Sequence, residues 1–129
     1  MRQLLGSVTQ HALHVCNGHG IWCELYEDGD IRVVGEQMVS PDYVMSLHHD
    51  RDLHRLFTSN DQPVLVESIY DVTDEPSITS AIRSIIAIPL VNSGRRTGTL
   101  VMFSTMEFGF EQDDVKLLTA FGDTVGVGI

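Results

Sequence analysis

The sequence predicts an α+β sandwich, in which a mainly antiparallel sheet carries the two terminal helices on one face. Three observations support this fold class. Both ends of the chain repeat apolar residues with helical spacing, the segments between them have strand patterns, and turn signals join neighbouring strands as hairpins. Because the terminal helices cover one face of such a sheet, the middle of the chain is left to cover the other.

The length and charge of the chain restrict its function. Its 129 residues suit one domain, and we expect a single domain over residues 1–129. The 18 acidic and 8 basic residues give a formal net charge of −10, which opposes contact with nucleic-acid phosphates and anionic membranes. The sequence shows neither an apolar run of membrane-spanning length nor a signal peptide. We therefore expect a cytoplasmic protein without nucleic-acid or membrane partners.

Helices are predicted over residues 2–16 and 111–128. The first ends at Asn17-Gly18, where glycine can adopt the left-handed conformation. The last opens with acidic residues, which the N-terminal end of a helix favours. The apolar side chains that should face the sheet are Leu4, Leu5, Val8, Ala12, Val15 and Cys16 in the first helix, and Leu117, Leu118, Phe121 and Val125 in the last.

Strand patterns occupy much of the sequence between these helices. Residues 21–26 alternate, and the Asp28-Gly29 turn leads into a return strand over residues 31–34. Residues 63–67 predict a short strand. Residues 85–91 are apolar on both faces, which predicts a central strand that pairs with residues 98–104. Pro89 has no N–H group to donate, so we expect a bulge or an unpaired position there.

The middle of the chain predicts short helices and loops. Ser40-Pro41-Asp42 has the features of a helix start, and helical stretches are expected over residues 41–57 with Leu53, Leu56 and Phe57 facing inward. The polar residues 71–79 predict irregular structure or one helical turn. Such segments over one face of a sheet form a natural place for a small-molecule pocket.

Several motifs, taken in order, resemble the GAF domain family. Residues 63–66, 71–76 and 82–90 are similar to the middle of such domains. Gly94, residues 97–100, Phe110, Asp113 and Leu117-Leu118 are similar to their C-terminal third. The match runs in order over residues 63–129, whereas the first sixty residues match only in pattern. The resemblance implies a six-stranded, mainly antiparallel sheet between a helical layer and a ligand-covering insertion.

The resemblance also implies a regulatory role. We expect a small-molecule or cofactor sensor that controls an attached output domain, such as a histidine kinase, a cyclase or phosphodiesterase, or a transcription regulator. The chain would then be a fragment of a larger signalling protein. The alternative is a ligand-free module that acts as a dimerising structural coupler. A closed interior favours the coupler and a lined cavity favours the sensor. The sequence identifies neither a ligand nor a cofactor.

One strand face supplies the first candidate ligand-binding residues. The aliphatic face of Ile21, Cys23 and Leu25 should meet the helices, so the opposite face should meet the covering segments and line any pocket. An equally good interpretation is that its aromatic residues only pack beneath a closed insertion. The candidate ligand-binding residues are Trp22, Glu24, Tyr26, His48, His49, His54, Tyr70 and Arg83, of which Arg83 could also tie its loop to a carboxylate such as Asp71.

The histidine-rich residues 48–54 combine imidazole and carboxylate groups, which are metal-ligand chemistry. The favoured interpretation is a solvated surface of mixed charge beside Leu53 and Leu56. Haem ligation by a histidine, as in some GAF sensors, and binding of another metal are the alternatives. We assign no metal ligand.

Several specialised functions of the family are disfavoured. The Asn-Lys-Phe-Asp-Glu signature of cyclic-nucleotide GAF domains is absent, as is the Asp-Ile-Pro motif of phytochrome-type domains that attach a bilin to cysteine. Free methionine sulfoxide reductases of this fold need thiolates in the loops over the pocket, but no cysteine follows Cys23. We therefore expect no enzymatic activity, and Cys16 and Cys23 are interpreted as small buried hydrophobic residues.

The terminal helices carry apolar residues outside their core-facing stripes, namely Leu13, Val115 and Val127. These positions could meet a second copy of the chain as a helical bundle, which is the arrangement that the GAF resemblance implies. The patch is small, so a weak homodimer is expected.

Overall fold

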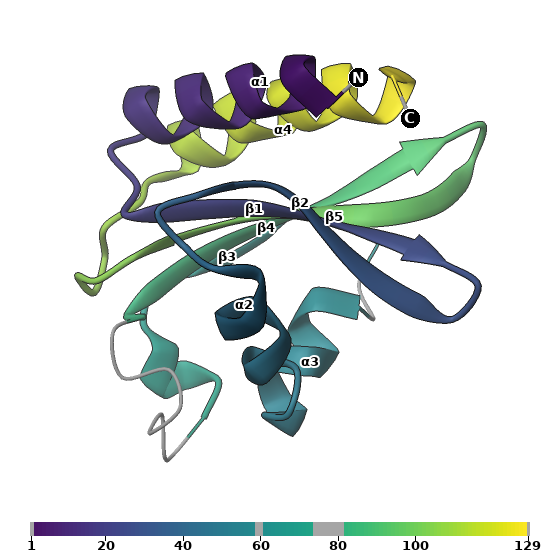
Figure 1. Cartoon of the computed structure of the whole chain (residues 1–129). Helices are drawn as coiled ribbons and strands as arrows, with labels where there is room; N and C mark the ends of the chain where they lie inside the picture. Colours follow the sequence, from purple (N-terminus) through teal and green to yellow (C-terminus); the bar gives the residue numbers. More distant parts are fainter. Residues whose placement is uncertain (1, 59–60, 74–81, 129) are drawn as a thin grey trace.

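The computed structural model describes residues 2–58, 61–73 and 82–128. A sheet forms the middle layer, two long helices cover one face, and two short helices lie against the other (Figure 1). The elements are α1 (Arg2–Val15), β1 (Gly20–Glu27), β2 (Asp30–Gln37), α2 (Pro41–Leu47), α3 (Arg51–Thr58), β3 (Val64–Val66), the 3-10 turn η1 (Ile69–Asp71), β4 (Ser84–Asn92), β5 (Arg95–Ser104) and α4 (Gln112–Gly128).

The sheet confirms the predicted fold class. Its strand order is β2-β1-β5-β4-β3, and every neighbouring pair is antiparallel. Five strands occur in the described residues, so the expected number of six is one too high for this part of the chain. The two terminal helices share one face, and α2 and α3 form the insertion on the other (Figure 1). No helix within the described residues is long and apolar enough to cross a membrane.

Local sequence accounts for the first hairpin. Asp28 and Gly29 both have positive φ angles, 52° and 83°, which is the geometry that suits a two-residue turn between twisted strands.

Ser40 begins α2 as predicted, because its side chain accepts a hydrogen bond from the Tyr43 amide. Residues 74–79 of the predicted irregular stretch lie outside the described residues, and η1 supplies one turn just before it.

The expected irregularity near Pro89 lies slightly later in the strand. Pro89 stands opposite Thr99 in the β4–β5 register, and the register shift falls between Leu90 and Val91. On its other side β4 pairs with β3 only over Ile85, Ile86 and Ala87. Pro89 is beyond this short ladder, so its missing N–H group costs no hydrogen bond to β3.

The end of α1 differs from the expectation in which residue turns left-handed. Asn17 adopts φ 55°, and the amide of Gly18 bonds the carbonyl of Leu13 while the amide of Asn17 bonds that of His14. This is a Schellman cap with asparagine in the left-handed position. Gly18 serves instead for close approach, since a Cβ there would lie 2.6 Å from the Met102 sulfur.

Two hydrophobic cores lie on opposite faces of the sheet. The helix-side core contains Ile21 and Cys23, and the insertion-side core contains Trp22, so the faces of β1 are oriented as predicted. The helix stripes need one correction. Val15 and Leu117 are 42% and 36% exposed, whereas Leu13 and Val115 pack against the core. Leu13 lies four residues after the buried Thr9 and three before the buried Cys16, so it belongs to the same face of α1 as these residues.

Gly98 permits a close approach between the backbones of β5 and β1. A Cβ at this position would overlap the backbone carbonyl oxygen of Glu24 on β1, and a backbone atom cannot move aside as a side chain does. We expect Gly98→Ala to lower the free energy of unfolding by about 3 kcal/mol, at the upper end of overpacking costs. Gly6→Ala is the matched control, because its Cβ meets nothing within 4 Å in α1. The control should raise the free energy of unfolding by roughly 0.5–1 kcal/mol. Urea denaturation measures both changes, and an unchanged Gly98→Ala stability would contradict the described strand packing.

Candidate functional site

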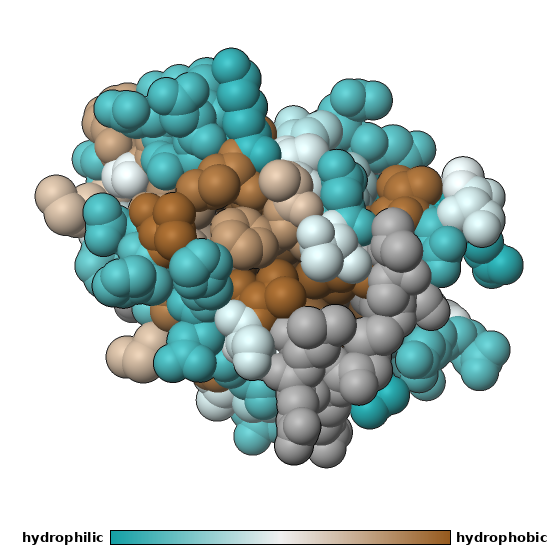
Figure 2. All heavy atoms as spheres, turned by 90° about the horizontal axis from the view of Figure 1, so that it is seen from above, coloured by the Kyte–Doolittle hydropathy of each residue, from teal (hydrophilic) through white to brown (hydrophobic). Residues whose placement is uncertain are grey.

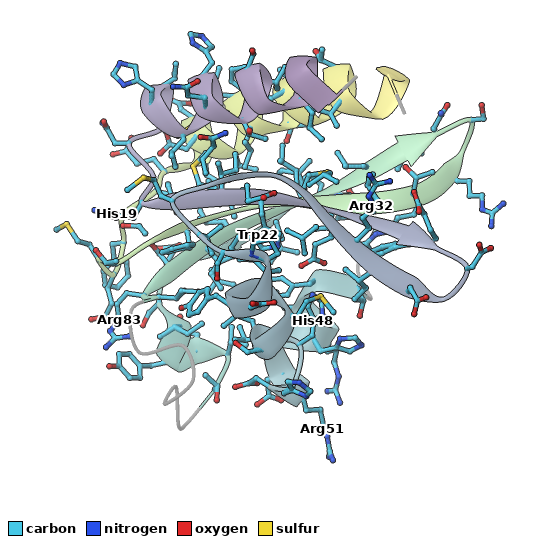
Figure 3. The ribbon with its side chains drawn as sticks, in the orientation of Figure 1. His19, Trp22, Arg32, His48, Arg51 and Arg83 are labelled. Atoms are coloured by element: carbon cyan, nitrogen blue, oxygen red, sulfur yellow. The ribbon has the colours of Figure 1, made fainter. Side chains whose placement is uncertain are left out.

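Trp22 lies at the centre of the insertion-side core. Its side chain has no exposed surface, and its ring packs edge-on against Phe57 of α3 at 5.8 Å and tilted against Phe103 of β5 at 6.1 Å between centroids. Figure 3 shows it between the sheet and the short helices. The side chains Val44, Leu47 and Leu53 of the insertion are also fully buried.

Glu24 places a carboxylate inside this apolar layer. It is fully buried, and its Oε2 atom accepts a hydrogen bond from Trp22 Nε1 at 2.8 Å and lies 2.8 Å from His48 Nε2. Its Oε1 atom has no hydrogen-bond partner. Within the described residues, the only other buried side-chain atom in that condition is the Tyr43 hydroxyl oxygen. An unpaired buried oxygen is costly, so the arrangement is poised to accept a hydrogen-bond donor.

Two histidines extend this polar group toward solvent. His48 caps the end of α2, and its side chain is 7% exposed. Its Nδ1 atom lies 2.8 Å from Nδ1 of His54 on α3, and its ring contacts Phe57. Trp22, Glu24, His48 and His54 therefore form one continuous polar chain, which runs from the sheet to the surface of the insertion.

Tyr26 belongs to a separate cluster at the end of α3. Its hydroxyl donates to the Phe57 carbonyl at 2.9 Å and contacts Thr99 Oγ1. Arg96 donates from Nη2 to both the Phe57 carbonyl and Thr99 Oγ1, at 2.7 Å each. Burial raises the pKa of the Tyr26 hydroxyl above its ordinary value. Arg96 and Thr99 were not singled out in the sequence, although Thr99 stands opposite Glu24 on the neighbouring strand.

The remaining predicted residues lie apart from this chain. His49 is exposed beside His48. Arg83 precedes β4, donates from Nη1 to the Ile82 carbonyl at 2.9 Å and lies over the half-exposed Tyr70 ring at 5.7 Å. Figure 3 places Arg83 and His48 well apart beneath the sheet. The structure thus divides the eight predicted residues among different parts of the insertion face.

The positions of the cysteines and of His48 bear on covalent attachment of a chromophore and on haem ligation by His48. Cys16 and Cys23 are both buried in the helix-side core, away from the insertion. Both nitrogens of His48 are engaged, one with Glu24 and one with His54, so neither is free to ligate haem iron in this arrangement. In the part of the chain that the structure describes, no three His, Cys, Asp or Glu side chains are grouped to hold a metal ion.

Three hollows lined by described residues lie elsewhere. One of about 840 Å³, open to solvent, runs beside α1 and the following turn. The second lies at the tips of the two hairpins, between Tyr26 and Thr97, and the third lies against β3 between Leu65 and Phe108. None of them is lined by Trp22, Glu24, His48 or His54.

The profile of the GAF domain family matches residues 1–129, and the chain belongs to this family. No curated protein matches the chain at a significant level.

Solved structures with similar folds include sensory domains and one enzyme. A domain of a protein described as a two-component sensor histidine kinase from Sinorhizobium meliloti superposes with a TM-score of 0.76 at 15% identity, covering 99% of this chain and 89% of that one. The third GAF domain of Slr1393 from Synechocystis, in its photoproduct state, gives 0.74 at 12% identity, covering 98% and 90%. A type II free methionine-R-sulfoxide reductase from Thermoplasma acidophilum gives 0.74 at 13% identity, covering 97% and 89%. At these identities the likeness shows the fold.

The thiols provide a direct test of how the helix-side core is packed. Burial, and secondarily the charge of Asp114, raises the pKa of Cys16 to about 11, and burial followed by the charge of Glu24 raises that of Cys23 to about 12. Both thiols should resist Ellman's reagent at pH 8 in the folded protein and react after unfolding, because the reagent needs an accessible thiolate. A Met106→Cys variant is the control and should react at once, since this side chain is 65% exposed.

The same shifts set the direction of a pH effect. A raised folded pKa means that the folded protein favours the protonated thiol, so this stabilisation is complete below the ordinary thiol pKa of 9 and is lost as pH rises toward 11 to 12. Rapid labelling of the native wild type at pH 8 would contradict the burial of both thiols.

Proposed function

We propose that this GAF domain is a regulatory sensor module whose input side is the insertion face, where Glu24 and His48 meet. The observation that carries the proposal is the fully buried Glu24 carboxylate with its unpartnered Oε1 atom. A core that serves only packing gains nothing from a buried charge, since replacing such groups by apolar residues is often neutral or stabilising. The membership of the GAF family and its sensory relatives support the same role.

The two unpartnered atoms also indicate the kind of occupant that would suit the site. Glu24 Oε1 is a hydrogen-bond acceptor, and the Tyr43 hydroxyl can donate or accept. Tyr43 packs against the same insertion-side core as Trp22. A small polar molecule with at least one N–H or O–H donor would complete the hydrogen bonding there. Such a molecule enters only if α2 or α3 moves, because the side chains between them and the sheet are buried.

A ligand-free structural coupler is the second candidate function. It is favoured by the closed packing of the insertion, where Trp22, Leu47, Leu53 and Phe57 have no exposed surface. In this case the polar chain would only hold α2 and α3 in one position relative to each other. Both proposed functions are regulatory, and the position of both thiols on the helix side of the sheet argues against thiol chemistry in the loops over the insertion.

The helical layer is the proposed output side. Both chain ends lie at the same end of this layer (Figure 1), from which an attached output domain, such as a histidine kinase, could be driven. Figure 2 looks down on the helical layer and shows apolar atoms gathered between polar ones. Among the side chains that the structure describes, Val15 and Leu117 are the exposed large apolar ones of α1 and α4. They replace Leu13 and Val115 as the proposed contacts of a weak homodimer. The predicted contact Val127 has a side chain outside the described residues.

The dimer proposal is tested by sedimentation velocity over a range of protein concentrations. We expect weak association that Leu117→Glu abolishes, because a charge in the contact between helices would lose its solvation. Met45→Glu is the control, since Met45 is similarly exposed at 41% but lies on α2, across the sheet. Association that persists in Leu117→Glu and disappears in Met45→Glu would assign the contact to the insertion instead.

The sensor and coupler functions are separated by native mass spectrometry and an absorption spectrum of the purified domain. A co-purified molecule identifies the ligand, and its return to the stripped protein should change the emission of Trp22, the only tryptophan. Glu24→Gln should weaken this binding about tenfold or more, as expected for a lost charged hydrogen bond of roughly 1.5–3 kcal/mol. Glu67→Gln, at an exposed carboxylate, should leave it unchanged. No bound molecule, together with a lowered stability of Glu24→Gln, would support the coupler, in which this carboxylate only holds the insertion in place.

A further inference from the structure

The polar chain contains three ionisable groups in direct succession. Glu24 is fully buried on β1, His48 is almost buried at the end of α2, and His54 lies exposed on α3. The two joining distances are 2.8 Å each. A set of groups that links a buried carboxylate to the surface through two imidazoles can take up protons from solvent, and its hydrogen bonds limit how many protons it can hold.

The Glu24 end of the chain accepts hydrogen bonds. Trp22 Nε1 can only donate, so it donates to Glu24 Oε2. His48 Nε2 donates to the same oxygen when the carboxylate is ionised, which fixes one proton on that nitrogen. With Glu24 ionised, this hydrogen bond holds His48 to the sheet.

The contact between the histidines has room for one proton. Nδ1 of His48 and Nδ1 of His54 face each other at 2.8 Å, and a hydrogen bond requires one of them to donate and the other to accept. A protonated imidazolium carries hydrogen on both nitrogens, so two imidazolium rings cannot form this bond. With one added proton the pair carries one positive charge and keeps its hydrogen bond. When both rings are imidazolium, two positively charged N–H groups face each other and the hydrogen bond is lost.

We propose that Glu24, His48 and His54 form a proton-binding site, and that uptake of the second proton by the histidine pair separates α3 from α2. This inference rests on the proposed role of the insertion as the input side, and it makes the proton a ligand of that side. His48 is tethered to Glu24, so His54 and α3 are the parts that move. Histidine suits this role because its charge changes within the physiological pH range.

A movement of α3 reaches the core through Phe57. The Phe57 ring contacts both the His48 ring, at 5.5 Å, and the Trp22 ring, at 5.8 Å between centroids. The carbonyl of Phe57 is held by Tyr26 and Arg96 on the sheet. The end of α3 is thus anchored while its middle carries His54, so a shift there alters the surroundings of Trp22.

Other ionisable groups lie on the elements around Glu24, His48 and His54, and some of them have partners of their own. Asp50 Oδ1 accepts the amides of Asp52 and Leu53 at the start of α3. On the sheet, Arg32 of β2 pairs with Glu27 of β1 at 3.9 Å. Exposed charges act weakly at a distance because salt screens them. The further groups are Tyr26 on β1, Glu36 on β2, Asp42 and Tyr43 on α2, His49 between the helices, Arg51, Asp52 and Arg55 on α3, and Arg96 on β5.

The test is a titration of Trp22 fluorescence in the intact chain between about pH 8 and pH 5, the range of histidine charge change. We expect a sigmoidal change in emission in the wild type. His54→Gln should lose at least half of its amplitude, because glutamine cannot take up the second proton. His49→Gln is the matched control, since this neighbouring histidine is exposed and outside the chain, and it should retain the full change. Circular dichroism at both pH limits establishes that each variant is folded.

Two results would overturn the proposal: a flat titration in the folded wild type, or a transition that His54→Gln leaves unchanged. Hydrogen exchange of α3, corrected for the intrinsic pH dependence of exchange, is the second measurement. It should accelerate at the acid limit in the wild type and not in His54→Gln. A flat titration would contradict proton binding but not the binding of a co-purified ligand. The absence of a co-purified ligand would contradict the ligand sensor but not proton binding, so the two proposals can be tested independently.

Discussion

The hydrogen bonds of the buried Glu24 carboxylate are the constraint on which the insertion depends. A carboxylate without exposed surface needs donors, and Trp22 and His48 supply them to Oε2. This requirement fixes the orientation of the indole in the core and places the end of α2 over β1. His48 then positions His54 and Phe57 of α3. The carboxylate thus helps to position α2 and α3, which are short helices with few core contacts of their own.

The central sheet supplies the rigidity that such a buried group requires. β1 lies between β2 and β5, so its backbone is paired on both sides. Gly98 allows β5 to approach the carbonyl of Glu24 closely, and the Thr99 hydroxyl on the same strand bonds the Phe57 carbonyl at 2.8 Å. Gly98 and Thr99 of β5 therefore help to position both the backbone of Glu24 and the C-terminal end of α3. The apolar helix-side core holds the opposite face of the same strands.

Much of this fold was predictable, because strand alternation and turn residues are local properties. Ile21 and Trp22 were assigned to the correct faces, and Asp28-Gly29 to the correct turn. Helix rotation was less predictable: Leu13 and Val115 pack against the core, whereas Val15 and Leu117 are exposed. In the candidate site, Glu24 was proposed from its strand face, and His48 and His54 from the composition of residues 48–54. The contact between Glu24 and His48 could not be predicted, since it joins residues 24 positions apart. The contact between His48 and His54 depends on the bend between α2 and α3. Arg96 escaped notice because an arginine near a turn has no distinguishing pattern.

The two faces of β1 suggest how an input could reach the helices. Adjacent residues point to opposite cores, so Trp22 and Glu24 contact the insertion while Ile21 and Cys23 contact the helical layer. A close-packed core transmits displacement, but a signal also requires an element with two discrete arrangements that the input favours unequally. The apolar contacts of either core change gradually with distance. The hydrogen bond between His48 and His54 is different, because it is either formed or broken according to the number of protons on the pair. Of the contacts described, it is therefore the one best suited to set the position of α3, with β1 as the connection to the helical layer.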